Sequence, residues 1–239
     1  MVQEKKEQQR EEARRQRQEQ AQADLEGAQA KNGPLSLREH MLRGGLIISV
    51  FLVLAVSSFA LDPAVHSLAS ILRSPALTFI MGIASYPLTL LLVPYGLMSF
   101  LLLDMGRRRH AVLVWVIFIL TIIVSYLIKL SAMRVRPDGL VMDVPLLGLP
   151  DYSFPSTHAA LSFAPIPLLG KDFPSLRWFW VLFGLIVIMS RIYLGYHFFS
   201  DVVCGAGLGI IIGMLTMSYG PRIIDAIRKA FDRRAEGSA

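Results

Sequence analysis

Residues 111–128 read AVLVWVIFILTIIVSYLI, a run without a single charged side chain. An α-helix of this length spans about 27 Å, which approaches the hydrocarbon thickness of a bilayer. A soluble domain cannot keep so much continuous apolar surface out of water. The run therefore predicts a transmembrane helix, and it sets the fold class of the whole chain.

Further apolar runs lie on either side of this one. They cover residues 44–61, 76–103, 157–169, 178–193 and 201–220. Prolines interrupt two of these runs, so we expect kinks or breaks there. The interrupting residues are Pro87, Pro94, Pro165 and Pro167. Together the six runs predict an all-α fold, a six-transmembrane helical bundle, with the segment 62–75 lying at the membrane surface.

The two ends of the chain differ from this bundle. Residues 1–43 mix basic and acidic side chains with Gln and Ala and contain no long apolar run. Such a composition buries too little apolar surface to offset the entropy of ordering, so we expect a charged, disordered or solvated helical tail. The predicted domains are this N-terminal tail, a membrane domain over 44–220, and a basic C-terminal tail over 221–239.

The distribution of charge argues against a nucleic-acid partner, although the net charge is +6. The basic residues cluster at the ends of apolar runs, where they set orientation and meet anionic headgroups. The single cysteine, Cys204, lies inside an apolar run and can form neither an intramolecular disulfide nor a Cys-based metal site. We interpret it as a buried, inert thiol.

The short loops predict the orientation in the membrane. Arg107, Arg108 and Arg109 lie in one loop, and five further basic residues follow residue 221. The positive-inside rule places this loop and both termini in the cytoplasm. The segments 129–156 and 194–200 then face the extracytoplasmic side, and Trp178 and Trp180 would mark the opposite interface.

Polar residues that are hard to explain by packing all fall on the predicted outer side. They are Lys129, Arg134, Arg136, Ser156, His158, Arg191, His197 and Asp201. Ionisable residues near the ends of membrane helices are costly and are usually functional. Cations and histidines converging from three separate segments predict an anion-binding site with a nucleophile and an acid.

The residue types in each of the three segments suit a different part of a phosphate-binding site. The ammonium of Lys129 and the planar guanidinium of Arg136 together suit a tetrahedral phosphate. Ser156 is typical of a helix start, where backbone N–H groups can hold a phosphate oxygen. His197 and Asp201 are four residues apart, so a helix would place them on one face, where the carboxylate can fix the tautomer of the imidazole.

The same residues resemble a known family. The segments Lys129-x6-Arg136-Pro137, Pro155-Ser156-Thr157-His158 and Ser190-Arg191-x5-His197-x3-Asp201 are similar to the three signature motifs of the type 2 phosphatidic acid phosphatase (PAP2) superfamily. Those motifs are K-x6-RP, PSGH and SR-x5-H-x3-D. The first and third match fully, and the second has Thr157 where Gly is usual. The added bulk and hydroxyl could narrow the site or shift its substrate preference.

The resemblance implies a two-step hydrolysis of a lipid phosphate without metal or cofactor. His197 would be the nucleophile that becomes a phosphohistidine, Asp201 would orient it, and His158 would be the general acid. The phosphate would be held by Lys129, Arg136, Ser156, Thr157 and Arg191. The family's membrane branch implies an integral protein of a bacterial inner membrane, with membrane lipids as its surroundings.

The substrate implied first is a polyprenyl, undecaprenyl-type diphosphate. Phosphatidylglycerophosphate, phosphatidate and lipid A 1-phosphate are alternatives, as is transfer of the phosphate to an acceptor lipid. A non-catalytic transporter or scaffold is a third class of function, against which stands the complete set of expected catalytic residues.

Several residues receive a structural interpretation. Arg134 is expected to meet headgroups, and the carboxylates of Asp138, Asp143 and Asp151 are expected to be solvated in a loop. His40, His66 and His110 are assigned no role. Gly205, Gly209 and Gly213 recur every four residues and predict close helix packing, which we favour inside the bundle over a homodimer interface.

Overall fold

The computed structural model describes residues 20, 37–86, 88–140, 143–144 and 148–236. The chain divides into two compact units, residues 1–50 and 51–239, and the second unit contains all the candidate site residues. Most of the predicted N-terminal tail lies outside the described residues. Within them the structure is α-helical except for one two-stranded antiparallel pairing, so the predicted all-α class is confirmed.

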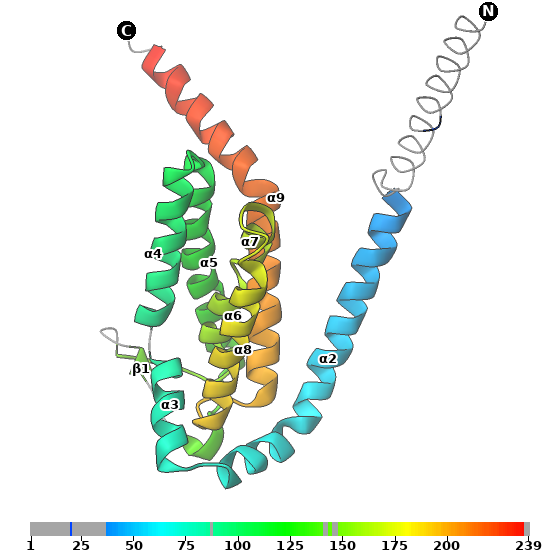
Figure 1. The fold of residues 1–239 in the computed structure, drawn as a ribbon, viewed down its shortest axis with the longest axis vertical. Helices are drawn as coiled ribbons and strands as arrows, with labels where there is room; N and C mark the ends of the chain where they lie inside the picture. The colour runs from blue at the N-terminus through cyan, green and yellow to red at the C-terminus, as the bar shows by residue number, and fades with distance from the viewer. Residues whose placement is uncertain (1–19, 21–36, 87, 141–142, 145–147, 237–239) are drawn as a thin grey trace, which may run out of the picture. The chain divides into compact units, whose positions relative to one another are not determined.

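The helices follow one another along the chain with short connections, except for the longer loop between α5 and α6 (Figure 1). They are α2 Leu37–Ile71, α3 Pro75–Ser85, α4 Leu88–Asp104, α5 Arg108–Ala132, α6 Thr157–Phe163, α7 Ile166–Asp172, α8 Arg177–Tyr193 and α9 Phe199–Glu236. Between α5 and α6 lie the short 3-10 helix η1 Pro137–Gly139 and the strands β1 Asp143–Val144 and β2 Leu149–Pro150.

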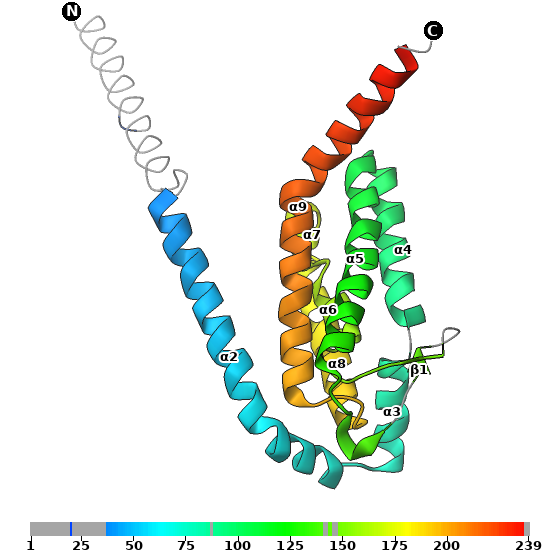
Figure 2. The ribbon, with the colours of Figure 1, turned by 180° about the vertical axis from the view of Figure 1, so that it is seen from behind.

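The short helix α6 lies at the centre of the bundle. It packs against α5, α8 and α9, while α4 covers α5 and α3 covers α8. The view from behind shows α9 running alongside α5 and the α6–α7 pair (Figure 2). The loop between α5 and α6 and the turn between α8 and α9 therefore meet at the same end of the bundle, where the candidate site residues lie.

Three helical stretches in the described part of the chain are long and apolar enough to cross a membrane. They are Ser49–Ile71, Arg108–Ala132 and Phe199–Ala226. The predicted surface segment 62–75 is helical in its first part, because α2 continues through Pro63 to Ile71, and its place at the membrane surface stays a prediction. The predicted run 76–103 is divided into α3 and α4. Tyr86 has the extended ψ of 143° that a residue before proline prefers.

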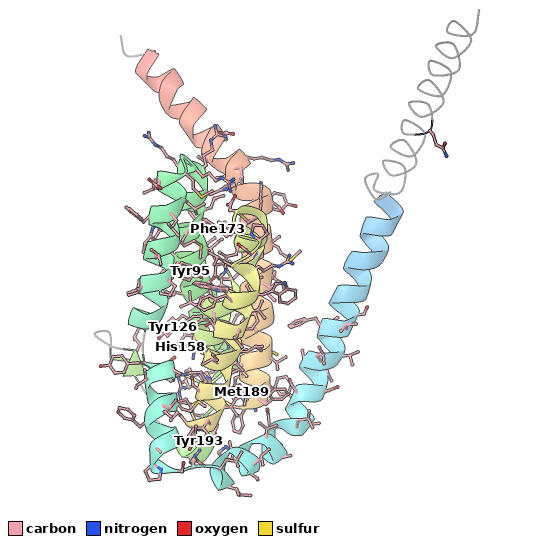
Figure 3. The ribbon with its side chains drawn as sticks, viewed as in Figure 1. Tyr95, Tyr126, His158, Phe173, Met189 and Tyr193 are labelled. Atoms are coloured by element: carbon pink, nitrogen blue, oxygen red, sulfur yellow. The ribbon has the colours of Figure 1, made fainter. Side chains whose placement is uncertain are left out.

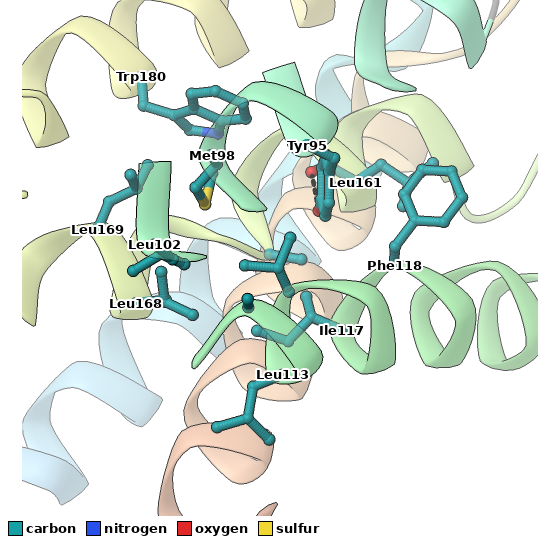
Figure 4. Packing of buried hydrophobic residues seen from close by; sticks show 13 residues of the cluster. Tyr95, Met98, Leu102, Leu113, Ile117, Phe118, Leu161, Leu168, Leu169 and Trp180 are labelled. Atoms are coloured by element: carbon teal, nitrogen blue, oxygen red, sulfur yellow. Dashed lines mark hydrogen bonds between the residues drawn. The ribbon is translucent and has the colours of Figure 1, made fainter. Parts of the chain in front are cut away.

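The predicted run 157–169 is likewise two helices, because Pro165 has no N–H to donate to the carbonyl of Leu161. Tyr95 replaces that donor, with its hydroxyl 2.9 Å from the Leu161 carbonyl oxygen (Figure 4). Trp180 donates from Nε1 to the next carbonyl, that of Ser162, at 2.6 Å. Trp180 is thus buried in the core rather than at the interface where the sequence placed it, while Trp178 is exposed.

The glycine stripe of α9 faces α6, as the sequence predicted. A Cβ on Gly205 would meet the carbonyl oxygen of Ser156, and one on Gly209 or Gly213 would meet that of Ala160 or Ala164. Backbone thus lies directly against backbone along the two helices. This stripe is used inside the bundle and is not available to a homodimer interface.

We expect Gly209→Ala to lower the melting temperature of the detergent-solubilised protein by several degrees, because its methyl group overlaps the Ala160 carbonyl and must push α9 away from α6. Gly96→Ala is the matched control, since no atom lies within 4 Å of its added Cβ. Thermal unfolding of both variants checks this. Equal melting temperatures would contradict the packing role of the stripe.

Candidate active site

Lys129 lies in the last turn of α5 and is almost fully buried, at 2% exposure. The helix ends at Met133, which adopts a left-handed conformation with φ 44° and donates its N–H to the Lys129 carbonyl. Lys129 Nζ pairs with Asp151 Oδ1 at 2.9 Å and donates to the carbonyl of Tyr152. A buried ammonium needs such partners, because an unpaired one would cost several kcal/mol.

Arg136 is held by the same loop and by the turn before α9. Its Nη2 pairs with Asp151 Oδ2 at 2.7 Å, and its Nε donates to the Asp151 carbonyl at 3.0 Å. Its Nη1 donates to the Tyr196 carbonyl at 2.6 Å and lies 3.3 Å from His197 Nε2. This guanidinium therefore fixes the position of one imidazole nitrogen. Burial lowers the pKa of Arg136, and the charge of Asp151 opposes that change.

The prediction that Asp151 is a solvated loop residue is wrong. Its two carboxylate oxygens bridge Lys129 and Arg136, which come from separate elements and would otherwise repel each other. Asp138 keeps a more exposed position, where it pairs with His66 at 3.0 Å and Arg73 at 3.5 Å. The side chain of Asp143 lies outside the described residues.

The turn from α8 to α9 brings His197 to this cluster. Gly195 has φ +73°, and the N–H groups of Gly195 and Tyr196 donate to the carbonyls of Ile192 and Arg191. This pair of bonds is a Schellman motif, which reverses the chain at a helix end. Arg191, in the last turn of α8, donates to Ser85 Oγ at 2.6 Å and stacks its guanidinium over the Tyr196 ring at 4.5 Å.

Asp201 lies in the first turn of α9, and it is fully buried. Its Oδ2 accepts from the Phe198 N–H at 2.8 Å and from the Ser153 hydroxyl. His197 Nδ1 lies 3.6 Å from the same oxygen, which is longer than a hydrogen bond but needs only a small shift to form one. A proton on Nδ1 would leave Nε2, beside Arg136, as the free nucleophilic nitrogen.

The start of α6 completes the cluster. Ser156 is its N-cap, as predicted, and accepts from the Ala159 N–H at 3.4 Å. The Ser156 N–H donates to the Asp201 carbonyl at 3.0 Å, which ties α6 to α9. Thr157 is the first helical residue and is partly buried. His158 Nε2 is buried without a hydrogen-bond partner among the described residues, within electrostatic range of Arg191 and His197. Figure 3 shows His158 in the interior of the bundle.

The structure thus brings all the predicted site residues to one end of the bundle. It adds five residues that the sequence interpretation did not assign to the site: Asp62, Ser85, Arg134, Asp151 and Ser153. Arg134 does not extend towards headgroups, because it pairs with Asp201 and Asp62, both at 2.7 Å. The sequence does contain a feature that points to Asp62: it is an ionisable residue at the end of an apolar run, and such residues are usually functional. Serines carry no comparable signal.

The electrostatics of His197 follow from this arrangement. Burial, and then the charges of Arg191, Arg136 and Lys129, hold the pKa of His197 well below its usual 6.5. A low pKa keeps the imidazole neutral at neutral pH, which is the form that can act as a nucleophile.

Comparison with known proteins agrees with the geometry. Residues 110–225 match the PAP2 superfamily, a range that contains all the predicted site residues. The chain belongs to the PAP2 superfamily. It is a membrane lipid phosphatase of the PAP2 type, a family of metal-independent hydrolases.

Two curated relatives show the range of this PAP2 branch. Phosphatidylglycerophosphatase B of Bacillus subtilis is 27% identical over 179 residues, covering 68% of this chain and 84% of that protein. Undecaprenyl-diphosphatase of Sulfolobus acidocaldarius is 32% identical over 133 residues, covering 52% of this chain and 63% of that protein.

Two crystal structures share the PAP2 fold. The phosphatidylglycerolphosphate phosphatase of Bacillus subtilis is 24% identical and superposes with a TM-score of 0.59 over 74% of this chain and 94% of that one. Aquifex aeolicus LpxE is 26% identical, with a TM-score of 0.54 over 66% of this chain and 96% of that one. The described helices therefore have the arrangement of a transmembrane PAP2 protein.

We expect the acid limb of kcat/KM to have its midpoint below pH 6.5, because the depressed pKa of His197 keeps the nucleophile deprotonated in that range. The measurement is a pH profile of phosphate release. The substrate's own ionisation, which for a phosphate monoester falls near pH 6, is followed separately by ³¹P NMR. After the substrate's ionisation is accounted for, an acid-limb midpoint at or above pH 6.5 would contradict the lowering of the His197 pKa by burial.

Proposed function

We propose that this PAP2 protein hydrolyses a lipid phosphate or diphosphate through a phosphohistidine on His197. The observation that carries the proposal is the position of His197 Nε2. It lies 3.3 Å from a phosphate-binding candidate, Arg136, while Nδ1 faces the buried carboxylate of Asp201. A phosphate held by Arg136 and Lys129 would present its phosphorus to that nitrogen.

The reaction has two steps. Nε2 of His197 attacks the terminal phosphorus, the bond from that phosphorus to the leaving oxygen breaks, and protonated His158 gives its proton to that oxygen. The leaving oxygen belongs to the lipid alcohol in a monophosphate and to the lipid monophosphate in a diphosphate. Water then attacks the phosphohistidine, His158 takes the water's proton, and inorganic phosphate leaves with the enzyme restored. The unpartnered Nε2 of His158 is available for both transfers.

Charge on the equatorial phosphate oxygens would be stabilised by the buried cations Lys129, Arg136 and Arg191. They are preorganised by Asp151, Ser85 and the backbone, so they need little rearrangement on binding. The Ser156 hydroxyl accepts a bond from Ala159 and can still donate its own proton to phosphate. Thr157 adds a hydroxyl beside it.

The proposed topology has six spans with the site on the extracytoplasmic side. The pairs α3–α4 and α6–α7 would each cross the membrane as one interrupted span, and α8 would be the fifth. Lys129 and Arg108 are separated by about 32 Å along α5, roughly one hydrocarbon thickness. The arginine loop in the cytoplasm thus puts the site at the opposite surface.

The proposed substrate is an undecaprenyl-type diphosphate, in line with the relative that is 32% identical. A specific observation favours phosphatidylglycerophosphate as the second candidate. The relative named for that substrate matches a longer part of this chain, 68% against 52%.

Mutation of the nucleophile tests the mechanism. We expect His197→Ala to lower phosphate release by at least about 10³-fold, because it removes the group that forms the covalent intermediate. His110→Ala, a histidine at the other end of α5, should keep wild-type activity, and a chelator should leave the wild type unaffected. Substantial turnover by His197→Ala would overturn the covalent route.

A substrate panel tests the specificity. Purified protein is given farnesyl and undecaprenyl diphosphate, phosphatidylglycerophosphate, phosphatidate and lipid A 1-phosphate at equal surface concentration, and both inorganic phosphate and lipid products are measured. We expect the highest kcat/KM on the prenyl diphosphates. A preference for phosphatidylglycerophosphate would support the second candidate, and phosphate recovered on another lipid would show transfer instead of hydrolysis.

A further inference from the structure

Arg134 is the least expected member of the cluster. The six residues between the motif positions Lys129 and Arg136 include it, and the motif assigns it no function. Yet its guanidinium makes three charge-assisted or polar bonds: Nη1 donates to Asp201 Oδ1 at 2.7 Å and to Ser200 Oγ at 2.6 Å, and Nη2 donates to Asp62 Oδ2 at 2.7 Å.

Two aromatic rings also flank this guanidinium. It lies 4.2 Å from the ring centroid of Phe198 and 5.3 Å from that of Phe59. Aromatic rings on a cation exclude water from it and strengthen its hydrogen bonds. A residue whose role is to meet headgroups would keep its charge in solvent, so this placement indicates a different function.

Asp62 closes the network from the other side. Its Oδ1 accepts from the backbone N–H of Ser200 at 2.8 Å and its Oδ2 from the Ser200 hydroxyl at 2.6 Å. A carboxylate at this position caps the first turn of α9 and interacts favourably with its dipole. Asp62, in α2, is thereby connected through Arg134 and Ser200 to the turn that carries Asp201.

The carboxylate of Asp201 is consequently fixed at both oxygens. Oδ2 faces His197 Nδ1 and accepts from Phe198 and Ser153, while Oδ1 is held by Arg134. The charge of Arg134 compensates the buried charge of Asp201, and Asp62 compensates part of the charge of Arg134. The charges of Asp201, Arg134 and Asp62 together determine how strongly the Asp201 carboxylate attracts a proton on Nδ1 of His197.

We propose that Arg134 and Asp62 are positioning residues that act through Asp201 on the reactivity of His197. This inference rests on the proposed function of His197 as nucleophile. Neither residue touches the phosphate: Arg134 orients Asp201, and Asp62 orients Arg134 while moderating its charge.

The test uses two substitutions that remove opposite charges from the same network, Arg134→Gln and Asp62→Asn. Both should lower kcat on the preferred panel lipid by on the order of 10–100-fold with KM nearly unchanged, as for other partners that orient a reacting group. Arg134→Lys, which keeps the charge, should restore part of the loss. The exposed pair of Arg109 and Asp225 supplies the control, since Arg109→Gln should change nothing.

The decisive readout is the pKa of His197, followed by ¹³C NMR of labelled histidine and assigned with His197→Ala. Arg134→Gln removes a positive charge and should raise this pKa, whereas Asp62→Asn removes a negative charge and should lower it. The other charged or titratable groups that face His197 are unchanged in both variants. They are Lys129, Arg136, His158, Arg191 and Asp201, with Asp151 behind Lys129 and Arg136 as their shared ion-pair partner.

The possible outcomes separate the two proposals. Shifts of opposite sign with a fall in kcat support the inference. Shifts of the same sign, or none, with a lower melting temperature would show a purely structural role and overturn it. A wild type that releases no phosphate from any panel lipid would refute the proposed function, and the NMR titration would still decide whether the network acts on His197.

Discussion

Three cations buried together at one end of a membrane bundle repel one another, and compensation of this charge is the constraint on which the site depends. Asp151 bridges Lys129 and Arg136. On the other side, Asp201 and Asp62 share the guanidinium of Arg134. A carboxylate or guanidinium left alone in such a place would cost several kcal/mol, so these paired charges depend on one another. Arg191, the third cation, is held by the Ser85 hydroxyl and the Tyr196 ring instead. Together these pairs hold the phosphate-binding groups in place before any substrate arrives.

The same constraint explains why the surrounding helices pack as they do. The charged groups come from the loop after α5, the start of α6 and the turn before α9, so these elements must meet closely. The glycines of α9 allow its backbone to lie against that of α6, and the Ser156 N–H then reaches the Asp201 carbonyl. Core packing through Tyr95 and Trp180 satisfies the carbonyls that the break at Pro165 leaves free. The close approach of α6 and α9 thus determines both the packing of the helices and the geometry of the site.

Much of this could be predicted from single residues and their spacing. An uncharged run can only be a membrane helix, glycine every fourth residue can only bring one helix face close to another, and a serine before an apolar helix is a natural cap. Sequence patterns mislead where a residue's position depends on a distant partner. They predict a solvated Asp151 and a headgroup contact for Arg134, because nothing near these residues in sequence shows that Lys129, Arg136 and Asp62 lie beside them. The interfacial position predicted for Trp180 differs from its buried one for the same reason.

Local sequence was enough to establish the helical membrane class, the three motif segments and the chemical types of their residues, since periodicity, hydrophobicity and local spacing act within one segment. Helix packing established which carboxylate neutralises which cation, which nitrogen of His197 faces Asp201, and that Asp62 is linked to Asp201 through Arg134. Those choices depend on distances between residues as far apart in the chain as 62 and 200. Such distances are set by how the helices pack, and local sequence does not encode them.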